Sequence, residues 1–177
     1  MRLLLPKNVS DLTRVTFRQE LKRSIPSGIR ESAASTFLLL IAIRHFDASP
    51  LMKGLLASSP FIGMILSPLL VLYAEKFQFK SATVASIFFI FSAIGYFLSM
   101  SVDSLYIFLI GSGIGLMCYS ICHPIFTNIY NENYPDKLRG RLYSKSVIVQ
   151  MIATIIFSWI AGKLLSKDFD NFLIVLL

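Results

Sequence analysis

Three long blocks without a charged residue constrain this chain more than any motif does. They cover residues 54–74, 81–102 and 104–131, and a fourth apolar block at residues 146–162 extends to a lysine at each end. A helix needs about 20 apolar residues to cross the hydrocarbon core of a bilayer. The four blocks therefore predict four transmembrane helices.

Composition and charge agree with a membrane protein. Hydrophobic residues make up 55% of the chain and charged residues only 15%, whereas an average soluble domain has about 25% charged residues. The formal net charge is +7, but the basic residues lie at the ends of the apolar blocks. A nucleic-acid surface needs basic residues on a soluble scaffold, so no nucleic-acid partner is expected.

A fifth, less apolar crossing is predicted at residues 29–48, where Glu31 and Arg44 lie near the ends. The apolar residues after Asn171 predict the start of a sixth helix that is cut off. We therefore predict an all-α membrane protein, with a transmembrane bundle at residues 29–177. The predicted crossings are residues 29–48, 53–75, 81–102, 104–130 and 143–166, with a partial crossing at residues 170–177.

Residues 1–28 are polar and basic and are predicted to form a separate juxtamembrane segment. Ser10 predicts the start of a short helix that ends near Arg23, before the helix-breaking residues 26–28. Such a basic helix is expected to lie on an anionic membrane surface. Its weak apolar face would consist of Leu12, Val15 and Leu21.

Lysine and arginine are distributed unevenly between the segments that connect the crossings. The segment up to residue 30 has seven, the link after the second crossing has two, and the link after the fourth crossing has four. The links on the opposite side have two, none and two. Because cytoplasmic loops are enriched in these residues, we expect a multi-pass protein of the cell or inner membrane with a cytoplasmic N-terminus.

Two of the basic links carry a further pattern. The chain reads YAEKFQFK at residues 73–80 and NYPDKLRGRLYSKS at residues 133–146. This arrangement resembles the major facilitator superfamily, whose second-to-third loop has a pattern close to G-x-L-A-D-R-x-G-R-K. Val71 and Gln78 stand where the family has glycines, and Phe79 replaces a basic residue. The matching residues are Ala74, Glu75, Lys76 and Lys80.

The resemblance covers residues 26–177 and implies a secondary transporter built from two six-helix halves, of which this chain would be the first. It implies three partners: the lipid bilayer, a small-molecule solute with or without a coupling ion, and a C-terminal six-helix half. No metal or cofactor is expected. In this family the first and fourth helices line the substrate cavity. The candidate cavity residues are Glu31, Arg44, Tyr119 and His123.

Each of these candidates has a structural alternative. An ionisable side chain inside a crossing is costly and indicates a function, but His123 precedes Pro124. Because proline frees a backbone carbonyl, a hydrogen-bonding role for His123 is equally open. Glu31 and Arg44 could instead extend to the membrane surfaces.

The resemblance also implies a latch between the basic links. Glu75, at the inner end of the second helix, could pair with Arg139 or Arg141, with Lys76 beside it. Such a contact would hold the bundle in one access state and must break during each transport cycle. The alternative is that these residues are ordinary solvated charges.

Glycines in the fourth crossing predict close helix packing. Gly111, Gly113 and Gly115 lie in an apolar helix, where small residues let neighbouring backbones approach. They are not a dinucleotide-binding loop, which would follow a strand. An alternative function is that of a small structural or assembly protein that oligomerises through Gly111 and Gly115. An intramembrane enzyme would need several convergent polar groups, so no enzymatic activity is expected.

Overall fold

The structure is a computed structural model that describes residues 9–167, and every regular element in that range is helical. The predicted all-α class is confirmed. The elements are α1 (Asp11–Ser32), the π-helical turn η1 (Ala33–Phe37), α2 (Leu38–Arg44), α3 (Pro50–Lys76), α4 (Ser81–Ser101), α5 (Leu105–Asn133) and α6 (Asp136–Lys167).

Four helices, α3 to α6, are long and apolar enough to cross a membrane. They coincide with the second to fifth predicted crossings. The first predicted crossing, residues 29–48, is not among the four, because its residues are divided between the end of α1, η1 and α2. The partial crossing predicted at residues 170–177 lies outside the described residues.

The helix break predicted at residues 26–28 is wrong, because α1 continues through Pro26 to Ser32. Ser10 caps its start, as predicted, and accepts a hydrogen bond from the Thr13 backbone. Proline removes one helical hydrogen bond and disfavours the preceding turn. Here Pro26 is exposed, whereas Ser27 and Gly28 are buried. Packing of the buried face thus outweighs the local preference.

The three residues of the apolar face predicted for this helix differ in burial. Leu12 and Val15 are 59% and 58% exposed, and only Leu21 is buried. Hydropathy cannot identify the face of α1 that packs against α6, because close helix contact in membranes favours small and hydrogen-bonding side chains. The residues that are buried along α1 include Thr13, Phe17, Glu20, Ser24, Gly28 and Ser32.

The chain divides into two compact units, with boundaries between Ala33 and Ala34 and between Ile129 and Tyr130. Unit 1 contains α1, the end of α5, and α6. Unit 2 contains α2, α3, α4 and most of α5. The first boundary lies inside the π-helical turn, and the second lies one and a half turns after Pro124 in α5.

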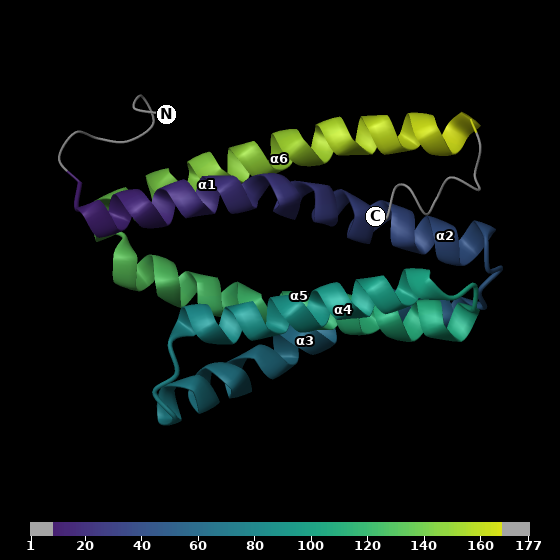
Figure 1. Cartoon of the computed structure of the whole chain (residues 1–177), viewed down its shortest axis with the longest axis horizontal. Helices are drawn as coiled ribbons and strands as arrows, with labels where there is room; N and C mark the ends of the chain where they lie inside the picture. Colours follow the sequence, from purple (N-terminus) through teal and green to yellow (C-terminus); the bar gives the residue numbers. More distant parts are fainter. Residues whose placement is uncertain (1–8, 168–177) are drawn as a thin grey trace. The chain divides into compact units, whose positions relative to one another are not determined.

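In unit 1, α1 and α6 lie side by side and run in the same direction (Figure 1). A β-carbon added to Gly28 would lie 2.3 Å from the Gln150 carbonyl oxygen, so only glycine permits this approach. The Thr154 hydroxyl donates to the Gly28 carbonyl at 3.0 Å, and the Ser32 and Ser158 hydroxyls are 2.6 Å apart. The seam is therefore close and polar.

In unit 2, α5 packs against both α3 and α4 through glycines. A β-carbon on Gly63 of α3 would lie 2.3 Å from the Met117 carbonyl oxygen, and one on Gly95 of α4 would lie 2.7 Å from the Gly111 carbonyl oxygen. The Ser92 hydroxyl donates to the Gly115 carbonyl at 2.7 Å. Gly63 and Gly95 were not singled out from the sequence.

The three glycines that were singled out lie in these contacts. Gly111 faces Ser99 and Gly95 of α4, Gly115 faces the Tyr96 ring, and Gly113 lies near the Ser59 hydroxyl. The close-packing surface of Gly111 and Gly115 is thus used within one chain. Oligomerisation through these two glycines, which the structural alternative requires, would have to displace α4.

Candidate functional site

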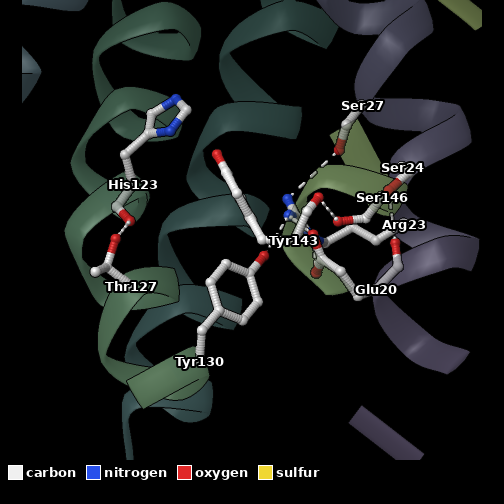
Figure 2. A network of polar contacts seen from close by, with 9 residues as sticks. All are labelled: Glu20, Arg23, Ser24, Ser27, His123, Thr127, Tyr130, Tyr143 and Ser146. Atoms are coloured by element: carbon white, nitrogen blue, oxygen red, sulfur yellow. Dashed lines mark hydrogen bonds and ion pairs between the residues drawn. The ribbon is translucent and has the colours of Figure 1, made fainter. Parts of the chain in front are cut away.

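The middle of α5 presents a histidine supported by aromatic side chains. Tyr119 is buried, and its ring centroid lies 5.6 Å from that of Phe89 and 5.5 Å from that of His123. His123 itself is exposed at the surface of unit 2. One turn later, the Thr127 hydroxyl donates to the His123 carbonyl at 3.3 Å (Figure 2). Tyr119 therefore supports an imidazole that is exposed at the surface of unit 2.

The other two cavity candidates lie outside α5, Glu31 in unit 1 and Arg44 in unit 2. Glu31 lies near the end of α1 and accepts a hydrogen bond from the neighbouring Arg30 at 2.7 Å, with its side chain 48% exposed. Arg44 is the last residue of α2 and is exposed. The ring contact between Tyr119 and His123 brings two of the four candidates together.

A π-helical turn lies between Glu31 and Arg44 and was not predicted. It spans Ala33–Phe37, and its two hydroxyl residues, Ser35 and Thr36, are both exposed. Single π-helical turns inside α-helices are often found at functional sites. No sequence signal marks this one, because alanine, serine and threonine are compatible with an ordinary helix.

The predicted latch residues lie in different units. Glu75 and Lys76 end α3 in unit 2, and Arg139 and Arg141 lie in the first turns of α6 in unit 1. Arg139 donates to Asp136 at 2.5 Å within α6. The latch stays a prediction.

The turn that follows Glu75 has a defined geometry. Gln78 has a φ of 52°, in the left-handed region, and its amide donates to the Glu75 carbonyl at 3.1 Å. The Phe79 amide donates to the Ala74 carbonyl at 2.9 Å. These two hydrogen bonds form a Schellman motif, in which the left-handed position is usually glycine.

A buried polar cluster in unit 1 was missed by the sequence analysis. Arg23 forms two hydrogen bonds with the Glu20 carboxylate, Nε to Oε2 at 3.0 Å and Nη2 to Oε1 at 2.6 Å. Its Nη2 also donates to the Tyr130 hydroxyl at 3.1 Å, and its Nη1 lies 3.5 Å from the Ser27 hydroxyl (Figure 2). The Glu20 side chain is only 9% exposed and that of Arg23 is 26% exposed.

The cluster connects α1 to the corner between α5 and α6. The rings of Tyr130 and Tyr134 stack at 5.5 Å, and the Thr13 hydroxyl donates to the Asn133 carbonyl at 2.8 Å. Burial raises the pKa of Tyr134 well above its ordinary value, and the Glu20 carboxylate raises it further, whereas Arg23 partly opposes this shift. The first turns of α1 are therefore part of the folded unit.

One sequence signal could have indicated the cluster. Glu20 and Arg23 are three residues apart, the spacing of side chains that meet on one helix face. Glu20 also continues the series Thr13, Phe17, Glu20 and Ser24, whose steps of four, three and four residues follow a packed helix seam. A carboxylate in such a series predicts a buried pair rather than a solvated charge.

Comparison with known proteins agrees with this architecture. A family model described as Major Facilitator Superfamily matches residues 24–174, a range that begins within α1 and includes α3 to α6. No curated protein and no solved structure matches the chain. Members of this family are membrane transporters and not enzymes, which confirms the prediction of a non-enzymatic membrane protein. Because the match spans most of the sequence, this multi-pass membrane protein belongs to the Major Facilitator Superfamily.

Proposed function

We propose that this chain forms the N-terminal half of a secondary active transporter that moves a small solute by alternating access. The family match over residues 24–174 carries the proposal. Transport would require a second six-helix half, with the solute pathway between the two halves. A coupling ion could use the same pathway.

The pathway residues on this half would be Tyr119 and His123 of α5, together with Glu31 and Arg44. His123 supports this role best, because it is an ionisable side chain in an apolar helix and is exposed at the surface of unit 2. An imidazole exposed to lipid would be costly, so the exposed side of His123 is expected to face water or solute. Tyr119 would hold the ring in position.

Cysteine labelling tests this proposal without knowledge of the solute. His123→Cys, in a background with Cys118 and Cys122 replaced by alanine, should react with a membrane-impermeant maleimide, because a thiolate forms only where water is present. Ile90→Cys is the control, since Ile90 is 60% exposed on α4 and is expected to face lipid. If both cysteines react equally slowly, position 123 faces lipid and the proposed pathway is wrong.

The proposed orientation and latch can be tested on the same labelled protein. The distribution of basic residues supports a cytoplasmic N-terminus, and with that orientation Ser10→Cys should react only from the cytoplasmic side. A latch between Glu75 and the arginines of α6 would require Arg139 to exchange its partner Asp136. Glu75→Gln should then change the ratio of labelling at position 123 from the two sides. Glu132→Gln, at an exposed position near the end of α5, is the matched control.

A further inference from the structure

The end of unit 2 where α3 and α5 begin contains a contact between two links that are 58 residues apart in the sequence. The Nε2 atom of His45 lies 2.9 Å from the Oδ1 atom of Asp103. His45 directly follows α2, and Asp103 lies between α4 and α5. The His45 side chain is 25% exposed and that of Asp103 is 79% exposed. The contact therefore joins the end of α2 to another link at a place that water reaches.

The link that carries His45 has a defined conformation. The Phe46 ring meets the His45 ring edge-on at 4.6 Å and lies 5.0 Å from the ring of Phe108 in α5, which is 1% exposed. The Ala48 amide donates to the Ala42 carbonyl at 2.9 Å. A change of charge on the imidazole would thus act on a contact whose geometry is already set by packing.

The charges around this contact are few and balanced. Helix α4 carries no charged residue, and α5 carries none before its last turn. Within the described part of unit 2, the remaining segments at this end contribute two acidic and two basic side chains, and the structure places one of the acidic ones against His45. The four residues are Arg44, Asp47, Lys53 and Asp103.

We propose that His45 and Asp103 form a pH-sensitive clasp between the end of α2 and the α4–α5 link. Histidine is the side chain that ordinarily changes its charge between pH 5 and 8. A protonated imidazole adds Coulomb attraction to its hydrogen bond with a carboxylate, and this attraction is lost when the imidazole becomes neutral. The clasp is therefore strongest at mildly acidic pH and loosens as the pH rises.

The consequence of the clasp for transport rests on the proposed function, because Arg44, a candidate pathway residue, directly precedes His45. With a cytoplasmic N-terminus, one crossing separates this end of unit 2 from the cytoplasm. The clasp would then respond to the pH on the opposite side of the membrane. The clasp itself can be measured without a solute and without transport.

Amide hydrogen exchange of the full chain in a neutral detergent tests the clasp directly. The rate for residues 45–48 would be measured by mass spectrometry at pH 5.5 and pH 7.5 and divided by the rate of an unprotected chain at the same pH. Protection at pH 5.5 should exceed that at pH 7.5 by about 1.5- to 5-fold, the factor that a partly exposed ion pair contributes. The turn at residues 77–80, whose amides are hydrogen-bonded at the other end of unit 2, should be equally protected at both pH values.

The chain contains only two histidines, which supplies a matched control. His45→Gln keeps a hydrogen-bonding side chain that does not titrate, and Asp103→Asn removes the carboxylate, so each should abolish the pH dependence. His123→Gln should preserve it. The proposal is overturned if the wild-type protein protects residues 45–48 equally at both pH values. It is also overturned if the dependence survives in His45→Gln or Asp103→Asn, or is lost in His123→Gln.

Discussion

Replacing Arg23 by glutamine should destabilise unit 1, because it leaves the Glu20 carboxylate buried without its cation. The carboxylate is 9% exposed and accepts two hydrogen bonds from Arg23, which also donates to Tyr130. Breaking a fully buried ion pair by removing one partner costs about 3–5 kcal/mol. Because Arg23 is 26% exposed and water can partly replace it, we expect a loss of about 2 kcal/mol.

The same helix contains a matched control. Arg14 pairs with Asp11 at the same spacing and at 3.2 Å, but the side chains are 48% and 93% exposed. Solvent-exposed pairs contribute little, so Arg14→Gln should change the free energy of unfolding by less than about 0.5 kcal/mol. The two variants remove the same charge from one helix, and only burial of the pair differs.

Denaturant unfolding in detergent micelles, followed by far-ultraviolet circular dichroism, would measure both free energies. A third variant, Glu20→Gln with Arg23→Gln, removes both charges and should be more stable than Arg23→Gln alone, because no uncompensated charge remains. The reasoning is refuted if Arg23→Gln costs no more than Arg14→Gln, or if the double variant is the least stable of the three.

Three further substitutions test backbone geometry, packing and burial by the same measurement. Gln78→Gly should stabilise the protein by about 0.5–1 kcal/mol, because it relieves a φ of 52°, whereas Gln19→Gly within α1 should destabilise it by a similar amount. Gly95→Ala should cost at least about 2 kcal/mol, because the new carbon would lie 2.7 Å from a carbonyl of α5, whereas Gly162→Ala, which meets nothing within 4 Å, should be neutral or stabilising. Tyr134→Phe should be neutral or slightly stabilising near pH 7, because the buried Tyr134 hydroxyl has no hydrogen-bond partner among the described residues. The pKa of Tyr134 in the folded state is raised above the ordinary value of 10.0. Below pH 10 both states keep the phenol proton, whereas above pH 10 the unfolded state loses it first and the free energy of unfolding falls. Tyr134→Phe should remove the part of this alkaline destabilisation that comes from Tyr134.

The membrane helices could be predicted from the sequence because one physical requirement dominates them. The block at residues 81–102 corresponds to α4, Ser81–Ser101, and the crossing at residues 53–75 lies within α3, Pro50–Lys76. In lipid, every backbone N–H and C=O group must form its hydrogen bond within the segment. A long apolar block therefore has few alternatives to a helix, and charges at its ends mark where it leaves the membrane.

The first helix could not be predicted in the same way, because its neighbours decide its structure. Hydropathy ranks Leu12 and Val15 as the buried face and Glu20 as solvated, yet the seam with α6 and the corner at Tyr130 reverse this order. The contact of Glu20 with Tyr130, through Arg23, joins residues more than 100 positions apart. The spacing of Glu20 and Arg23 indicates their pairing, but no local pattern indicates the contact with Tyr130, which became visible only with the structure.

Gln78 shows how a departure from a family pattern can preserve the geometry that the pattern encodes. The family has glycine at this position, and the glutamine counted against the resemblance. The structure nevertheless places Gln78 in the left-handed conformation, with both hydrogen bonds of the Schellman motif in place. The turn is therefore specified by the end of α3 and by the following residues, and glycine only lowers its cost. The direction in which the chain leaves α3 beside Glu75 therefore does not require glycine at position 78, and a latch at Glu75 would depend on that direction more than on the identity of residue 78.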